Sequence, residues 1–271
     1  GEQRKGQAMA FPTIGLNIAN LLGIGPLTKL GEDLGDFVPP YLVIVGVTLL
    51  TIVLVVLTAS SDTKPETVSI ANELSALARP KIWFYTLLAA LVFTCWFEIY
   101  WNVRIWWTQL NEMPGEWYAI FLIVLGVGLV AGSQIGGMLA DRYRKLAIWI
   151  PVLGIILGVS VTAIFIHQPI MMLIGVFILG TFIQVICSPI VIQSMQSAPQ
   201  APMMSATMFQ VGACSGVFMA TFAYQFVNST FGEVAYNPLY IDFALIPLVL
   251  VFATLSLIKS SLMKSRKNPA T

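Results

Sequence analysis

Charged residues, histidine and cysteine are all scarce in this sequence. Only 10% of its 271 residues are Asp, Glu, Lys or Arg, whereas a soluble domain usually carries about 25%. The single histidine, His167, excludes a metal site made of several histidines. Cys95, Cys187 and Cys214 stand inside apolar runs without the spacing of metal ligands, so they are interpreted as core residues. We therefore expect no metal and no cofactor.

The composition also argues against several functions. A catalytic set inside a membrane would need clustered histidines, paired aspartates or a Gly-x-Ser-x-Gly turn, and the apolar runs contain none of these. A glycine-rich phosphate-binding loop is also absent, which argues against a directly ATP-driven pump. We expect neither an enzyme nor a partner of nucleic acids.

Long apolar runs dominate what is present. Hydrophobic residues make up 57% of the chain, and the mean hydropathy is +0.83. A bilayer core is about 30 Å thick, so a spanning helix needs about 20 mostly apolar residues. The runs do not alternate polar and apolar residues as barrel strands would. The sequence therefore predicts an all-α polytopic membrane protein with about eight transmembrane helices. They are expected at residues 8–28, 37–58, 82–104, 117–139, 146–166, 169–192, 204–228 and 238–258.

Basic residues concentrate on one side of this arrangement. All 14 of them except Lys29 and Arg104 lie before the first span, after the last span, or in every second connection. The remaining connections are acidic, with Glu32 and Glu112 among their residues. Because Lys and Arg mark cytoplasmic loops, we expect both termini in the cytoplasm and the chain in a bacterial inner membrane.

Glycines recur at intervals of four inside three of the predicted spans. Gly128, Gly132 and Gly136 form one such series, Gly154 and Gly158 a second, and Gly212 and Gly216 a third. This spacing allows the backbones of neighbouring membrane helices to approach closely. The sequence therefore predicts a tight helix bundle.

One short stretch, GGMLADRYRK at residues 136–145, carries most of the charge in the central part of the chain. A basic anchor on the cytoplasmic face would explain it by composition alone. The order of residues goes further, because it resembles the loop signature of the major facilitator superfamily. The residues that carry the resemblance are Gly137, Asp141, Arg142, Arg144 and Lys145. In that family the loop is a conformational latch and not a substrate site, which implies the same role here.

The start of the chain resembles the fifth helix of exporters in the same superfamily. Gly15, Gly23, Gly25 and Pro26 match the glycine-proline pattern of that helix, whereas Lys29 departs from it. The whole chain then matches helices 5–12 of the family fold, most closely in the drug:proton antiporters and arabinose-efflux permeases. The resemblance implies that four N-terminal helices are lacking, so that a missing segment or a second chain would complete the fold.

This frame also divides the chain. Residues 1–58 would be the last two helices of the N-terminal six-helix half, and residues 82–271 the C-terminal half with a cytoplasmic tail. Residues 59–81 would be the cytoplasmic linker between the halves. The linker is polar and contains Pro65 and Pro80, and its sequence predicts a short surface helix at 67–78.

Two acidic residues inside the spans are candidates for proton coupling, because ionisable groups in a membrane are costly and often functional. Glu98 is the leading candidate and lies roughly 25 Å along its helix from Lys81 at 1.5 Å per residue. The alternative is that Glu98 stands in an aqueous outer mouth of the bundle. Asp242 is the second candidate, near the outer end of the last span, where a structural role is also open.

Several uncharged residues could line a path for a small-molecule substrate. Amide side chains can bind sugar hydroxyls but can equally hydrogen-bond between helices, and aromatic residues can stack on a ligand or mark the membrane interface. The candidates are Asn17, Asn20, Tyr100, Trp101, Asn102, Gln184 and Gln210.

Together these features predict a secondary active transporter in the lipid bilayer. The resemblance implies proton-coupled efflux of sugars or small drug-like compounds by alternating access, with protons and a small molecule as partners. The alternative is a receptor or assembly module that keeps part of a transporter fold but does not transport.

Overall fold

The computed structural model describes residues 15, 23, 26–27, 30–31, 33–36, 38–58, 69–143, 146–232 and 236–267. Gly15, Gly23 and Pro26 have helical backbone conformation. Asn17, Asn20, Gly25, Arg144 and Lys145 lie outside the described residues, as does most of the span expected at 8–28.

The described residues form helices throughout and no strand, which confirms the all-α prediction. The long helices are α2 (Val38–Thr58), α4 (Pro80–Ile105), α5 (Gly115–Arg142), α6 (Trp149–Ile164), α7 (Pro169–Ser197), α8 (Pro202–Phe231) and α9 (Asn237–Lys267). Shorter elements are α3 (Ile70–Leu74), the 3-10 turn η2 (Ser75–Ala78) and the π-helical turn η3 (Trp106–Leu110). Six of the long helices are long and apolar enough to cross a membrane, and α6 is an apolar helix of 16 residues.

Each predicted span after the first coincides with one of these helices, although several helices extend beyond the predicted bounds. The helix α9 continues to Lys267 and α5 continues to Arg142. The charged residues at the C-terminal end of each helix are therefore helical and do not lie in a loop. The helix α6 begins at Trp149, three residues later than expected, because residues 146–148 form a turn. The predicted linker helix corresponds to α3 and η2 together.

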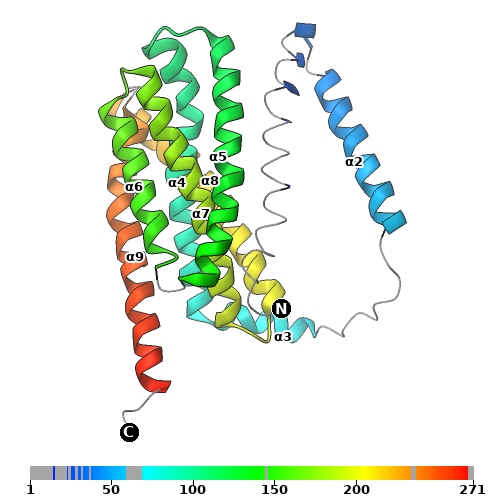
Figure 1. The fold of residues 1–271 in the computed structure, drawn as a ribbon, viewed down its shortest axis with the longest axis vertical. Coiled ribbons are helices and arrows are strands. Elements are labelled where there is room, and N and C mark those ends of the chain that lie inside the picture. Colours follow the sequence, from blue (N-terminus) through cyan, green and yellow to red (C-terminus); the bar gives the residue numbers. More distant parts are fainter. Residues whose placement is uncertain are drawn as a thin grey trace.

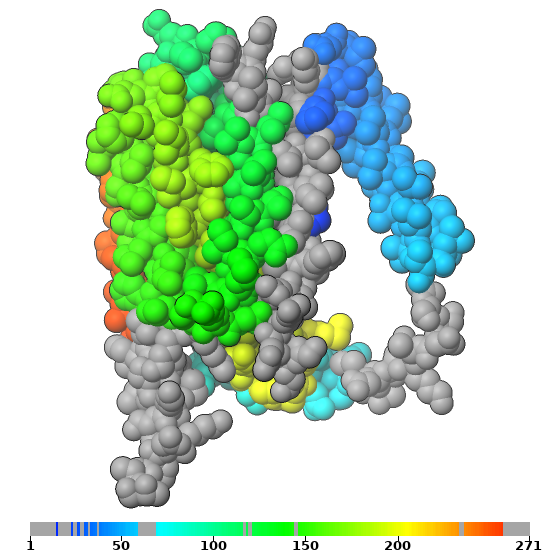
Figure 2. All heavy atoms as spheres, in the orientation of Figure 1, coloured from blue at the N-terminus to red at the C-terminus, as the bar shows by residue number. Residues whose placement is uncertain are grey.

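The helices α4 to α9 pack into one bundle, and α2 stands apart from it (Figure 1). In Figure 2 the atoms of α2 form a separate column beside the bundle. The apolar side chains of α2 are exposed along its length. A helix that is apolar all round is suited to lipid or to contact with other membrane helices, and not to water.

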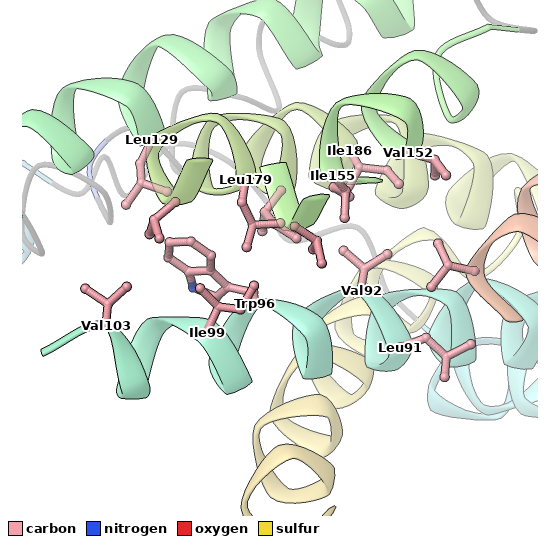
Figure 3. Close-up of a cluster of buried hydrophobic side chains, with 14 of the residues drawn as sticks. Leu91, Val92, Trp96, Ile99, Val103, Leu129, Val152, Ile155, Leu179 and Ile186 are labelled. Carbon is pink, nitrogen blue, oxygen red and sulfur yellow. The ribbon is translucent and has the colours of Figure 1, made fainter. Parts of the chain in front are cut away.

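The core of the bundle lies between α4 and α7. Large side chains such as Trp96 and Ile99 of α4 pack against Leu179 and Ile186 of α7, as Figure 3 shows. The helix α5 adds Leu129 to the same cluster. The helices α4 and α7 therefore form the centre of the bundle, and α5, α6, α8 and α9 pack around them.

Glycine allows three of the helix contacts to form. A Cβ atom at Gly132 of α5 would lie 2.3 Å from the backbone oxygen of Thr181 on α7. A Cβ at Gly212 of α8 would lie equally close, at 2.3 Å, to the backbone oxygen of Thr86 on α4. Gly158 of α6 meets the backbone of α7 in the same way. The predicted tight packing of the three glycine series is confirmed.

The α5–α7 contact includes a proline effect. Pro189 lies inside α7 and has no N–H, so the carbonyl of Val185 loses its usual helical donor. A Cβ at Gly136 of α5 would stand 2.4 Å from that Val185 oxygen. The absence of a side chain at Gly136 therefore lets α5 approach the carbonyl that Pro189 leaves without its helical bond.

Candidate proton site and linker contact

Glu98 is buried inside the bundle. It lies on α4 between core residues Trp96 and Ile99 and is only 1% exposed. Its Oε1 atom has no hydrogen-bond partner among the described residues. The alternative that Glu98 stands in an aqueous mouth is wrong for the described bundle. A buried carboxyl oxygen without a hydrogen-bond partner is costly, which makes Glu98 a candidate functional group.

Asp242 is also buried, although it lies only about one and a half turns from the start of α9. Its side chain is 0% exposed, and neither carboxyl oxygen has a hydrogen-bond partner of good geometry among the described residues. Its helix packs against α4. A position near a helix end therefore does not give this acid access to water.

The two acids lie on α4 and α9, two helices that pack against each other. Cys95 and Glu98 are three residues apart, so they share one face of α4. Sequence reasoning did not connect the two acids, and it interpreted Cys95 only as a core residue. Its spacing from Glu98 was the one signal that pointed to a shared face.

Asn102 lies on the same face of α4 as Cys95 and Glu98, but its amide already makes a hydrogen bond within the helix. Its Nδ2 donates to the backbone oxygen of Glu98 at 2.8 Å, and the side chain is buried. Tyr100 stacks on Trp96 with ring centroids 5.2 Å apart, whereas Trp101 is 44% exposed and leans on Phe97. The three substrate candidates on α4 therefore do not face one common space.

The two glutamine candidates lie on other helices. Gln184 of α7 is buried beside Gly132 of α5. Gln210 of α8 is exposed, and its Nε2 lies 3.7 Å from the sulfur of Cys214. Gln210 lines an open apolar hollow along one face of α8, together with Val211 and Phe218. The described residues do not gather the substrate candidates into a single pocket.

The predicted latch residues lie at the end of α5. Gly137 is buried, and Asp141 and Arg142 form part of the last helical turn. The Arg142 guanidinium lies over the ring of Tyr143, 5.5 Å from its centroid. In Figure 1 this end of α5 lies at the same end of the bundle as α3 and the end of α9. The latch role itself stays a prediction.

The linker is fastened to the turn between α7 and α8. Glu73 of α3 accepts a hydrogen bond at 2.7 Å from the backbone N–H of Met204, in the first turn of α8. Arg79 donates one at 2.6 Å to the carbonyl of Ser197, at the end of α7. A carboxylate at a helix start and a guanidinium at a helix end both satisfy free backbone groups and suit the helix dipole.

Apolar packing supports the same contact. Ala76 of the linker and Ile82 of α4 are fully buried against Ala198 and Ala201 of the turn. Sequence reasoning predicted the linker helix but not its docking partner.

Removing the Glu73 carboxylate should free the linker from this turn. Loss of a helix-capping group costs about 0.5–2 kcal/mol, and one or two kcal/mol changes an opening equilibrium roughly 5–30-fold. We expect Glu73→Ala to raise the rate of thermolysin cleavage within residues 70–79 by about that factor, because cleavage follows the open population.

The matched control is Asn72→Ala, since Asn72 is exposed and its side chain makes no hydrogen bond to another described residue. Cleavage sites are mapped by mass spectrometry of the purified chain. Equal cleavage rates in the two variants would mean that Glu73 does not hold the linker.

Comparison with known proteins agrees with the architecture. The Major Facilitator Superfamily matches residues 1–223 of this chain. Inner membrane transport protein YdhP of Escherichia coli (strain K12) is 26% identical over 144 residues, which cover 52% of this chain and 36% of that protein. Chloramphenicol resistance protein of Streptomyces lividans is 28% identical over 154 residues, or 55% of this chain and 39% of that protein.

The matched segments therefore span little more than a third of these relatives. The family match, in contrast, covers most of the chain and accords with its bundle of apolar helices. This chain is an integral membrane protein that belongs to the Major Facilitator Superfamily.

Proposed function

We propose that this chain works as a proton-coupled secondary transporter, which exports sugars or small drug-like compounds by alternating access. The observation that carries the proposal is the buried carboxyl of Glu98, whose Oε1 has no hydrogen-bond partner among the described residues. Such a group can take up and release a proton as the surrounding helices move. Asp242 is the second proton-coupling residue of the proposal.

The proposed organisation of the chain follows from its match to helices 5–12 of the family fold. Residues 1–58 would be the last helices of the N-terminal half, 59–81 the linker, and 82–271 the C-terminal half. The separation of α2 from the bundle in Figure 1 supports this division. The end of the bundle that carries Arg79, Lys81 and Arg142 would face the cytoplasm, because basic residues favour that side.

Substrate binding is proposed for the residues that the sequence singled out. On the described helices these are Tyr100, Trp101, Asn102, Gln184 and Gln210. The name of the Streptomyces lividans relative makes chloramphenicol one compound to test. L-Arabinose represents the sugars that the sequence resemblance implies.

Substrate-linked proton movement tests the proposal. The full chain is reconstituted into lipid vesicles that contain a pH-sensitive dye, and a pH gradient is imposed. We expect chloramphenicol or L-arabinose to speed the decay of that gradient, since each transported molecule would exchange for a proton. Vesicles without protein provide the background rate. Decay at the background rate with both compounds would count against proton-coupled transport of either class.

A further inference from the structure

We propose that the linker helix, formed by α3 and η2, is a removable cap for the turn between α7 and α8. In this conformation the linker completes the two helix ends that meet at the turn, and its release leaves both ends without a cap. The cap itself does not depend on the proposed function. Its release during transport rests on that function.

The start of α8 has no cap of its own. Its N-cap residue, Ala201, carries no side-chain acceptor, and Pro202 has no N–H. The N–H of Ala201 bonds back to the carbonyl of Ala198 at 2.9 Å. The N–H of Met204 therefore depends on an acceptor from outside the turn, and Oε2 of Glu73 accepts it at 2.7 Å. The linker thus takes the place of the Ser, Thr, Asp or Asn that usually caps a helix start.

The end of α7 is completed in the same way. Its C-cap residue is Ala198, which has no polar side chain. The hydroxyl of Ser197 donates to the carbonyl of Gln193 within α7, at 2.8 Å. The carbonyl of Ser197 accepts a hydrogen bond from Nη1 of Arg79 at 2.6 Å, and a cation suits the negative end of a helix. One short segment, residues 73–79, therefore supplies an acid to one helix end and a base to the other.

Twy separate units meet at this contact. The indole nitrogen of Trp83 donates to the carbonyl of Leu77 at 2.8 Å, which fastens η2 to the start of α4. Across the turn, the hydroxyl of Ser194 on α7 donates to the carbonyl of Ser205 on α8 at 2.9 Å. The linker with α4 forms one unit and the α7–α8 turn the other. The bonds of Glu73 and Arg79 join them, together with the apolar packing described above.

The linker helix is suited to release because it buries little of its own surface. None of the residues of α3 is buried, and Ala76 is the buried residue of η2. Ile70 and Leu74 are 75% and 48% exposed. Segments with few buried apolar contacts open at low free-energy cost, and an isolated helix of one or two turns is not stable in water. Once released, the linker helix should therefore also lose its helical hydrogen bonds.

Release would lengthen the connection between α2 and the bundle. At no more than about 3.6 Å per residue, the chain from Thr58 to Ile70 reaches about 40 Å and the chain from Thr58 to Pro80 about 80 Å. The docked linker therefore halves the distance over which α2 can move from the bundle. Alternating access requires the two parts of a transporter to move against each other, so the cap restrains that movement while it is in place.

Hydrogen exchange of the full chain in mild detergent, followed by mass spectrometry, tests the cap. The backbone N–H groups of Ala198, Ala201 and Ser205 report on the turn, since each is hydrogen-bonded there. We expect Glu73→Ala to speed exchange in both the turn and residues 70–79 by about 5–30-fold, because one opening exposes both. Asn72→Ala, on the same exposed helix, should exchange like the wild type.

Two results would overturn the cap. The first is faster exchange in residues 70–79 of Glu73→Ala with unchanged exchange in the turn, because the linker would then lie on the turn without capping it. The second needs no variant. If the turn opens only after the linker is released, the turn of the wild-type chain must be at least as well protected as the linker. A turn with lower protection factors than the N–H of Arg79, which bonds to Ala76, would contradict this order.

A cross-link tests whether the cap must be released for transport. Asn72 and Met203 are exposed neighbours of Glu73 and Met204, on helices that contact each other. A short bis-maleimide between Asn72→Cys and Met203→Cys should slow exchange in the turn and stop substrate-linked proton movement in the vesicle assay. Asn72→Cys alone, treated with the same reagent, is the control.

The outcomes separate the cap from the proposed function. A cross-linked chain that moves protons at the rate of the control would reject release during transport. A wild-type chain without substrate-linked proton movement would reject the proposed function, and the exchange measurements would still decide the cap.

Discussion

Gly132→Val is expected to separate α5 from α7 and to lower the stability of the bundle more than any other single change discussed for the fold. The new Cβ would stand 2.3 Å from the backbone oxygen of Thr181 and 3.0 Å from the Cβ of Gln184. A backbone oxygen cannot rotate away as a side chain can, so the helices themselves must move. Overpacking usually costs about 1–3 kcal/mol of stability. We expect the cost of Gly132→Val to lie at the upper end of this range or above it.

The measurement is the loss of the monodisperse species on heating, followed by size-exclusion chromatography in mild detergent. Gly46→Val on α2 is the matched control, because a Cβ at Gly46 meets no atom within 4 Å. It adds the same side chain to a helix that stands apart from the bundle. Equal midpoints for the two variants would show that the α5–α7 contact is not limiting for stability.

Glu98→Gln is expected to abolish uphill transport while leaving downhill exchange of substrate in place. Glutamine has nearly the same size and still forms hydrogen bonds, but it cannot bind and release a proton near neutral pH. One pH unit corresponds to about 1.4 kcal/mol, so one-for-one exchange with a proton can sustain about a tenfold substrate gradient. Because the Glu98→Gln protein would carry no proton, the ratio of substrate concentrations across the vesicle membrane should fall to one.

Accumulation and exchange are measured in the same vesicles with radiolabelled chloramphenicol or L-arabinose. Ser256→Ala is the control, since its hydroxyl bonds weakly to Gln193, at 3.4 Å, on a part of α9 that lies 14 residues beyond Asp242. A tenfold gradient that survives in Glu98→Gln would remove Glu98 from the coupling mechanism. Loss of both accumulation and exchange would instead point to a substrate-binding or structural role.

Much of the fold could be predicted because its signals are local. The length and polarity of each apolar run are enough to place a membrane helix, and seven of the predicted spans correspond to α2 and α4–α9. The glycine series at Gly132 and Gly212 also predicted close packing correctly, since spacing by four places small residues on one face. Helix ends were less accurate, because α9 continues past the apolar run to Lys267.

The candidate site was predicted only in part. Glu98 and Asp242 each stood out as acids within apolar runs, but the helix period could not show that Asp242 is fully buried. The position of Asp242 near the end of the last span favoured a structural role. The substrate candidates Gln184 and Gln210 were chosen by the same polar-in-apolar rule, yet one is buried and the other exposed.

The sequence by itself determined which segments are membrane helices and which ends of them carry charge. These properties depend on residues that are neighbours along the chain, so composition and period suffice. Only the tertiary structure decided that Asp242 is fully buried, and that Glu73 bonds to Met204 across 131 positions of sequence. Such contacts depend on how all helices pack at once, because each glycine contact and each core side chain sets the rotation of the next helix.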